Sequence, residues 1–493
     1  MYEAVIGLEV HVQLSTATKL FCGCSTLFGA QPNSQVCPVC MGLPGSLPVL
    51  NQKAFEYAIK VAVALNCRIA EFTKFDRKNY FYPDLPKNFQ ISQYDLPLSE
   101  DGFLDVHLNG NTNPVRKDSP NKIGLSNGVK RIGIKRVHLE EDAGKLIHTE
   151  DSSLVDFNRT GIPLLEIVSY PDINSPQEAY QYLSSLKQII RYLGVSSCDM
   201  EKGILRCDAN VSVRKQGAKA LGVKIELKNM NSFRGVRDAL DFEIKRQIEL
   251  LEEGRNIIQE TRLWDAQERK SESMRTKEEA QDYRYFPEPD LPPFTISQQL
   301  QEKIRDSLPE LPEARLTRFI RDYQLSEYDA GLLISEKEIA DFFENCFRLY
   351  PEAKIVANWI CGPLLSELNN RMPSSISELN ISAEDFINLI KKVKDGEISN
   401  LIAKSILTEM IDTGESPEGI IQKKNLIQIS DTETLDKIIT EVLKDNAESV
   451  KDYLNGKENA IMFLVGRVMQ KSKGKANPKV VLEMLKKKLK RRD

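Results

Sequence analysis

Residues 4–14 read AVIGLEVHVQL, and the rest of the chain is organised around this stretch. Apolar and polar side chains alternate, so a β-strand places Leu8 and Val10 on one face and Glu9 and His11 on the other. The pattern predicts a strand with one buried face. It also sets a carboxylate beside an imidazole, and both can reach one divalent cation. A half-buried strand with a solvated polar face is the alternative.

The composition is that of a soluble globular protein, with 493 residues, 41% hydrophobic and 28% charged. At about 150 residues per domain, this length predicts roughly two to four domains. The formal net charge of -4 excludes a polycation, so any contact with nucleic acid must come from local basic patches. No apolar run reaches the roughly 18 residues of a membrane helix, and Met1 leads directly into the strand, so we expect a cytoplasmic protein with no membrane contact.

Four of the nine cysteines form two close pairs near the N-terminus. One residue separates Cys22 from Cys24, and two residues separate Cys37 from Cys40. Two close pairs joined by a loop are typical of a tetrahedral zinc site, which is structural because four thiolates leave no position open for a substrate. Four unrelated thiols, or a redox pair at Cys37 and Cys40, are the alternatives. A redox pair does not require the other two cysteines.

Carboxylates recur later in strand-like stretches. Glu140, Glu141 and Asp142 close a predicted strand, where three adjacent acids are unfavourable unless a cation or solvent compensates them. A solvated acidic turn is the alternative. Glu166 stands alone in an apolar run, where burial without a partner is costly. A further alternating strand carries on its polar face Arg206, Asp208, Asn210, Ser212 and Arg214.

That polar row suits a metal-bound phosphate, with Asp208 and Asn210 for the cation and Arg206 for phosphate oxygens. A solvated outer face explains the row equally well. The chain has no glycine-rich phosphate loop and no dinucleotide fingerprint, so any use of ATP depends on metal and strand carboxylates. Residues 124–128 match a nucleophile elbow, but they lie in a polar loop and we reject the match. Residues 77–90 are rich in aromatics and prolines, which indicates either a packed surface loop or a surface for nucleotides.

Strand alternation gives way to helical periodicity after the Leu-Pro-Pro run at residues 291–293. We therefore expect an α+β protein with a mixed-sheet domain at residues 1–293, a helical domain at 294–395 and a small helical tail domain at 396–493. The tail is rich in lysine, which favours contact with nucleic acid over a merely solvated helix.

Five motifs resemble those of the B subunit of the aspartyl/glutamyl-tRNA amidotransferases, and they occur in that family's order. They are residues 5–13 (VIGLEVHVQ), 80–87 (YFYPDLPK), 138–144 (HLEEDAG), 205–212 (LRCDANVS) and 282–287 (DYRYFP). The tail resembles the small C-terminal domain of the same family, so the resemblance covers essentially the whole chain.

The resemblance implies a glutamine-synthetase-like N-terminal domain and a heterotrimer that also holds an amidase (A) subunit with a small (C) subunit. The amidase would release ammonia from glutamine. The B subunit would bind misacylated Glu-tRNA(Gln) or Asp-tRNA(Asn) and phosphorylate the side-chain carboxylate with ATP. Ammonia would then displace the phosphate. The cysteines place this chain in the zinc-bearing group of the family.

Residues and resemblance together predict a magnesium site made by Glu9, His11, Glu141 and Glu166. Glu140 or Asp142 are alternative ligands to Glu141. Asp208 completes the expected catalytic set, and the residues expected to hold ATP are Arg206, Asn210, Ser212 and Arg214. The helices from about residue 295 would hold the tRNA.

Two other functions compete with this hypothesis. A non-catalytic, zinc-stabilised tRNA-binding adaptor does not explain why Glu9 and His11 face one way on an apolar strand. A free-standing carboxylate–amine ligase for a small metabolite does not explain the long helical extension with a basic end.

Overall fold

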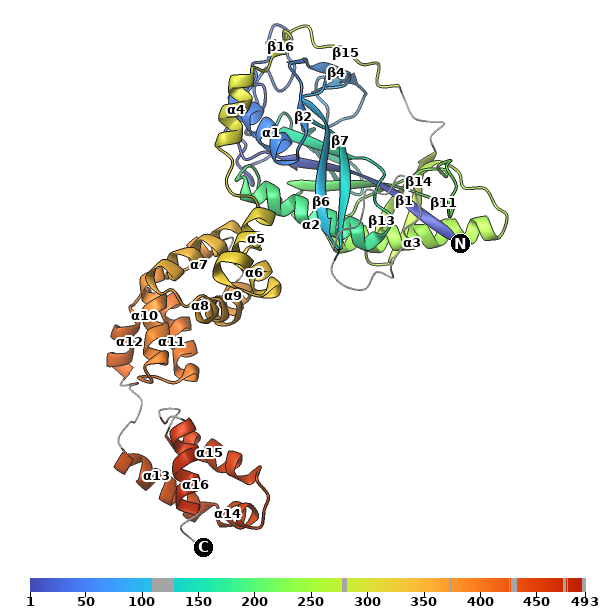
Figure 1. The fold of residues 1–493 in the computed structure, drawn as a ribbon. Coiled ribbons are helices and arrows are strands. Elements are labelled where there is room, and N and C mark those ends of the chain that lie inside the picture. The colour runs from blue at the N-terminus through green and yellow to red at the C-terminus, as the bar shows by residue number, and fades with distance from the viewer. Residues whose placement is uncertain are drawn as a thin grey trace. The chain divides into compact units, whose positions relative to one another are not determined.

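The chain divides into two compact units, Met1–Leu311 and Pro312–Asp493 (Figure 1). The structure, a computed structural model, describes residues 1–108, 128–276, 282–371, 375–424, 426, 432–472, 476 and 478–489. The nucleophile-elbow match at residues 124–127 and parts of the lysine-rich tail, including 490–493, lie outside the described residues. None of the described helices combines the length and hydropathy needed to cross a bilayer.

A nine-stranded mixed sheet forms the centre of the first unit, and the strand predicted at residues 4–14 lies in its middle. Its order is β14-β13-β12-β11-β1-β10-β7-β6-β2, and β1 is antiparallel to both of its neighbours. The strands are β1 (Tyr2–Gln13), β2 (Arg68–Ile69), β6 (Ser99–His107), β7 (Val129–Glu141), β10 (Pro163–Ser169), β11 (Leu205–Lys215), β12 (Ile225–Lys228), β13 (Glu260–Asp265) and β14 (Lys270–Thr276).

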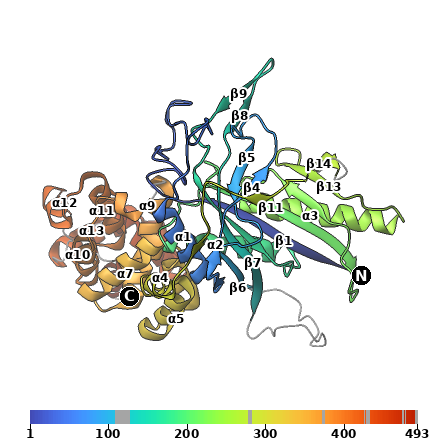
Figure 2. The ribbon, with the colours of Figure 1, turned by 90° about the horizontal axis from the view of Figure 1, so that it is seen from above.

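Three helices cover the apolar face of the sheet (Figures 1 and 2), namely α1 (Gln52–Ala64), α2 (Pro176–Tyr192) and α3 (Phe233–Glu252). The alternation predicted for β1 is confirmed, because Ile6, Leu8 and Val10 are fully buried in the core that these helices share. Burial of each such side chain stabilises the fold by about 1.5–3 kcal/mol. The polar side chains of β1 therefore lie on the opposite face of the sheet, which carries the candidate functional site.

Short strands attach distant segments to this sheet. A three-stranded sheet of order β15-β4-β5 joins β4 (Asp76–Asn79), β5 (Phe89–Ser92) and β15 (Phe286–Pro287). A second pair joins β3 (Phe72–Thr73) to β16 (Phe294–Thr295), and the projecting hairpin in Figure 2 is β8 (Lys145–His148) with β9 (Ser153–Asp156). These strands bring the aromatic stretch at residues 80–87 to the motif at 282–287.

The first unit ends later than residue 293, where we expected a boundary. The helix α4 (Gln298–Asp306) packs against α1, and Ile304 is buried in the core of the first unit. Leu308 and Leu311 also pack against that core, which carries the unit to residue 311.

The second unit is helical and has two separate hydrophobic cores. The first core joins α5 (Pro312–Tyr323), α6 (Glu327–Leu333), α7 (Lys337–Leu349), α8 (Ala353–Trp359), the π-helical η2 (Ile360–Leu364), α9 (Leu365–Arg371), the 3₁₀ turn η3 (Ile376–Glu378), α10 (Ala383–Lys394), α11 (Asn400–Thr413) and α12 (Pro417–Lys424). The second joins α13 (Thr432–Asp445), α14 (Ala447–Leu454), α15 (Ala460–Lys471) and α16 (Pro478–Leu489).

The boundary expected at 395/396 does not separate two cores. Phe386 of α10 and Ile402 and Ile406 of α11 are buried in the same core, because the apolar stripe of α11 packs back onto the preceding helices. The division between cores lies between α12 and α13 instead.

A partly buried ion-pair network ties α5 to α7 in the second unit. Glu344 accepts hydrogen bonds from Arg318 at 2.7 Å and from the hydroxyl of Tyr323 at 2.9 Å, and it also pairs with Arg315. Burial raises the pKa of Glu344, but these hydrogen bonds outweigh it and lower the pKa to about 2. The network therefore stabilises the fold while Glu344 is ionised.

We predict that Glu344→Gln lowers the free energy of unfolding at pH 7 by about 1–3 kcal/mol. Because the folded pKa lies below the unfolded value of about 4.3, the contribution is fully present above that pH and is lost as the pH falls toward 2. Urea unfolding of the full chain, followed by circular dichroism, should show this loss. Glu338→Gln, at an exposed position of α7, is the control, and equal stability of Glu344→Gln and the wild type at pH 7 would contradict the prediction.

Candidate functional site

Polar side chains from neighbouring strands line the face of the sheet opposite the helices. The register of β1 pairs His11 with Glu166 on one side and with Arg206 on the other, and it pairs Glu9 with Asp208. Residues directly opposite each other in antiparallel strands share a face. The structure thus brings together five side chains from three strands that lie far apart in the sequence.

The centre of this face can hold a divalent cation. His11 Nε2 lies 3.6 Å from a Glu166 oxygen and 3.8 Å from a Glu140 oxygen. One ligand atom from each of these three residues lies within 4.8 Å of the others, and both carboxylates are buried. Carboxylate oxygens with one imidazole suit magnesium or manganese.

A second imidazole flanks the same carboxylate. His138 Nε2 lies 3.3 Å from the Glu166 oxygen, and its buried Nδ1 has no hydrogen-bond partner among the described residues. Burial raises the pKa of Glu166, but His138 and His11 bring it well below its usual value. Glu166 is therefore held ionised in a buried position.

Glu9 lies in a strongly negative environment. Burial, followed by the charges of Glu166 and Asp208, raises the pKa of Glu9. Asn210 donates a hydrogen bond of 2.8 Å to Glu9. Crowded carboxylates of this kind attract a cation, because an opposite charge favours their ionised forms.

The three adjacent acids at the end of β7 divide between the two faces. Glu140 faces His11, whereas Glu141 accepts the backbone N–H of Ile91 at 2.9 Å and pairs with Lys87. Glu141 therefore does not join Glu9 and His11, contrary to our expectation. Glu140 takes that place, because successive residues of a strand point to opposite faces.

Asp142 follows the strand and is held by a guanidinium group. Both terminal nitrogens of Arg206 donate to its carboxylate, at 2.9 and 3.0 Å, and Gln13 donates at 2.7 Å. Arg206 was expected to contact phosphate, but in the structure its guanidinium group is engaged by Asp142.

The polar row of β11 is too long to serve one phosphate. Asp208 accepts a hydrogen bond of 2.6 Å from Lys228 and lies within the site. Ser212 pairs with Val5, and Arg214 pairs with Glu3, eight residues before His11. At about 3.4 Å per residue, this separation is about 27 Å along β1, so Arg214 does not reach the phosphate position expected beside His11. Ser212 is about 20 Å away by the same measure.

Two groups that lie over this face were not predicted from the sequence. Burial lowers the pKa of Lys78 in β4, but the negative charges of Glu140 and Glu166, among others, outweigh it and raise the pKa. Tyr285 stacks on Tyr94 with ring centroids 4.1 Å apart, and burial raises its pKa to about 12. The available signals were the stretch at 77–90, which contains Lys78, and the motif at 282–287, which contains Tyr285.

Other missed residues could have been found from alternation alone. Arg136 and His138 lie on β7 with the same parity as Glu140, and Lys228 shares the polar face of β12 with Glu226. A search that considers only carboxylates as site residues overlooks Arg136, His138 and Lys228.

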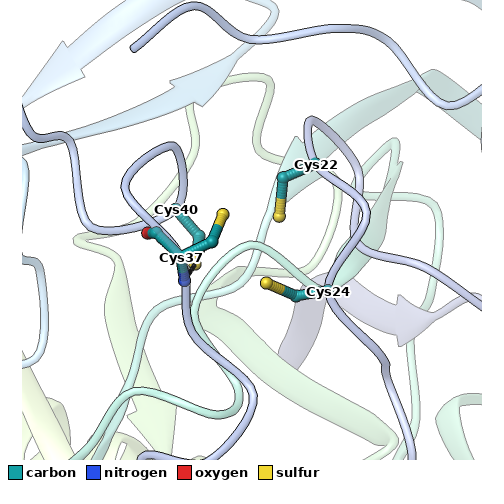
Figure 3. A group of neighbouring side chains, drawn as sticks. All are labelled: Cys22, Cys24, Cys37 and Cys40. Carbon is teal, nitrogen blue, oxygen red and sulfur yellow. Dashed lines mark hydrogen bonds between the residues drawn. The ribbon is translucent and has the colours of Figure 1, made fainter. Parts of the chain in front are cut away.

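The four paired cysteines meet in space. Figure 3 shows Cys22 and Cys24 on one loop facing Cys37 and Cys40 on another. The four sulfur atoms lie within 4.8 Å of one another, and those of Cys37 and Cys40 are 3.9 Å apart. Tetrahedral zinc with Zn–S bonds near 2.3 Å requires sulfur atoms about 3.8 Å apart, so the donor set fits such an ion.

Hydrogen bonds favour the thiolate form of Cys40. The backbone N–H of Cys37 donates to Cys40 Sγ at 3.2 Å, and Lys19 Nζ lies 3.7 Å from the same sulfur. A hydrogen bond with Cys22, together with these contacts, lowers the pKa of Cys40 to about 5. Metal binding requires deprotonated thiols, and Cys40 favours that form, whereas its hydrogen bond raises the pKa of Cys22 and burial raises that of Cys24.

Comparison with known proteins indicates one family along the chain. The family model described as the GatB/GatE catalytic domain matches residues 4–302, and the model described as the GatB domain matches residues 341–489. Proteins named as the B subunit of aspartyl/glutamyl-tRNA(Asn/Gln) amidotransferase are similar over nearly their whole length. Those of Caldanaerobacter subterraneus subsp. tengcongensis and Carboxydothermus hydrogenoformans are each 54% identical, over 99% of both chains.

A protein of the same name from a Geobacter species is 51% identical over 99% of both chains. The catalytic-domain match contains every strand of the central sheet and all of the polar face described above. By its sequence along its whole length, this chain belongs to the GatB family.

Proposed function

We propose that this chain is the ATP-using subunit of a tRNA-dependent amidotransferase, acting on Glu-tRNA(Gln), Asp-tRNA(Asn) or both. The observation that supports this best is the cluster of His11, Glu140 and Glu166, whose ligand atoms converge on the polar face of the sheet. The names of the similar proteins supply the substrate class. This chain therefore combines sequence similarity to these proteins with a site that is suited to phosphoryl transfer.

The proposed reaction has two steps. A carboxylate oxygen of the substrate side chain attacks the γ-phosphorus of ATP, and the bond to the β,γ-bridging oxygen breaks, so that its electron pair leaves with ADP. Ammonia then attacks the acyl carbon and loses a proton, and the carbon–oxygen bond to phosphate breaks to release inorganic phosphate.

The residues of this face have different proposed roles. A magnesium ion, when bound, would neutralise phosphate charge and align the reacting oxygens. Glu140, Glu166 and His11 are the residues that would hold it. His138 orients Glu166, and the pairing of Asp142 with Arg206 fixes the edge of the site. Asn210 orients Glu9 toward the same centre.

The partners follow from the proposed reaction. Ammonia must be supplied, which we assign to an amidase (A) subunit working with a small (C) subunit in one heterotrimer. We assign tRNA contacts to the helical unit, where α16 ends in Lys486, Lys487 and Lys488. We also propose zinc as the ion of the cysteine cluster and the cytoplasm as the location of the protein.

We predict that His11→Ala and Glu166→Gln each lower misacylated-tRNA-dependent ATP hydrolysis by the purified complex at least ~100-fold, because each removes a group that holds the phosphate-neutralising ion. Binding of misacylated tRNA, measured by filter retention, should change less than about 3-fold.

His148→Ala is the matched control, because His148 lies on the exposed β8–β9 hairpin and its ring hydrogen-bonds to Ser153. It should retain wild-type hydrolysis. If His11→Ala and Glu166→Gln also retain it, the site assignment is wrong and the adaptor function is favoured.

For the cysteine cluster we predict one zinc ion per chain by metal analysis of the purified protein. Cys37→Ser and Cys22→Ser should each abolish or strongly reduce the zinc content, because three thiolates hold the ion far less firmly. Cys361→Ser, in the helical unit, should leave the content unchanged. A wild-type protein that is folded and free of metal would exclude the zinc site.

A further inference from the structure

Lys78 is a cation that faces the carboxylates of the site without an ion pair among the described residues. It lies on β4, where alternation sends Arg77 to the opposite side to pair with Glu288 at 2.7 Å. The strand next to β4 contacts the end of β7 that carries Glu140, and the negative charges of Glu140 and Glu166 act on Lys78 and raise its pKa.

The position of β4 over the site is fixed by hydrogen bonds to the end of β7. The register of β4 and β5 pairs Lys78 with Gln90. Gln90 donates a hydrogen bond of 2.6 Å to the backbone carbonyl of Glu141, and Ser92 donates one of 3.3 Å to the carboxylate of Glu140. The β4–β5 pair is therefore anchored to the strand that carries the acids.

The ring of Tyr283 positions the ammonium group of Lys78. Lys78 Nζ lies 4.9 Å from the centre of the Tyr283 ring, which is a cation–π contact. The backbone N–H of Asn79 donates to the carbonyl of Tyr283 at 2.8 Å, which fixes the ring beside the lysine. A cation–π contact leaves the N–H donors of the ammonium group free for an anion.

Other cations of this face lie beside carboxylates, and Arg136 is 3.9 Å from a Glu166 oxygen. Arg206 is bound by Asp142, and Lys228 bridges Asp208 at 2.6 Å and Glu226 at 3.1 Å. The carboxylates neutralise the positive charges of Arg206 and Lys228, so these two side chains attract an incoming phosphate only weakly. Lys78 differs from them because Glu140 and Glu166 act on it although it forms no ion pair among the described residues.

We propose that Lys78 is a catalytic residue that donates hydrogen bonds to the γ-phosphoryl oxygens of ATP during transfer to the substrate carboxylate. This inference rests on the proposed function. As the oxygen–phosphorus bond to ADP breaks and the new bond to the carboxylate forms, charge lies on the equatorial phosphoryl oxygens. A preorganised cation on the side opposite the carboxylates stabilises that charge. No proton is transferred by Lys78 in this step.

The test uses the full heterotrimer with misacylated tRNA and measures ADP formation in single turnovers without any nitrogen source. This isolates phosphoryl transfer from amide formation. Lys78→Met should lower the rate 100-fold or more, while the ATP concentration for half-maximal rate changes less than 3-fold. Lys78→Arg, which keeps the charge, should restore at least a tenth of the wild-type rate.

Lys53→Met is the matched control. Lys53 also stacks on a tyrosine, with Nζ 4.8 Å from the Tyr57 ring, but it lies on α1 away from the polar face. It should retain the wild-type rate. Manganese binding by Lys78→Met should match the wild type in a titration followed by electron paramagnetic resonance, because a folding defect would abolish it.

The outcomes separate this inference from the function on which it rests. If the wild-type complex forms no ADP in response to misacylated tRNA, the proposed function itself fails. If wild type, Lys53→Met and Lys78→Met all form ADP at similar rates, only the role of Lys78 is overturned. The role is also overturned if Lys78→Met slows amide formation but leaves ADP formation unchanged.

Discussion

The contact between His11 and Glu166 across β1 and β10 is the constraint on which the rest of the site depends. Carboxylates are costly to bury unless a cation or hydrogen bonds compensate them. Glu166 and Glu140 are both buried here, on a sheet whose opposite face is packed with apolar side chains. Two imidazoles and a lysine approach these two carboxylates, and a divalent cation held by His11, Glu140 and Glu166 is our proposal for this cluster.

Backbone hydrogen bonds connect the segment that carries the cysteine loops to the edge of that site. The backbone N–H of Leu20 donates to the carbonyl of Gly161 at 2.8 Å, and Gly161 in turn donates to the carbonyl of Asp142 at 2.9 Å. Asp142 holds Arg206 at the edge of the polar face. A metal bound by the four cysteines would therefore stabilise the backbone that carries Asp142, although the two candidate metal sites share no ligand.

Much of this arrangement could be predicted from the sequence, because it depends on local periodicity. Alternation in residues 4–14 predicts which face of β1 carries Glu9 and His11, and the spacing of the cysteines predicts their cluster. Alternation does not specify where a strand ends, so it could not decide between Glu140 and Glu141. Strand pairing is also non-local: β4 meets β15 across roughly two hundred residues, so the position of Lys78 beside Tyr283 is visible only in three dimensions. The boundaries expected after residues 293 and 395 differ from the divisions at residue 311 and between α12 and α13, because amphipathic helices do not indicate which core they join.

A crystal structure of the complex with manganese and a non-hydrolysable ATP analogue, in which anomalous scattering locates the ion, would test the proposed cation site decisively. We expect an ion bound by His11, Glu140 and Glu166, in contact with the triphosphate. An ion bound to the triphosphate elsewhere, with these three side chains outside its coordination sphere, would contradict this assignment and the mechanism built on it.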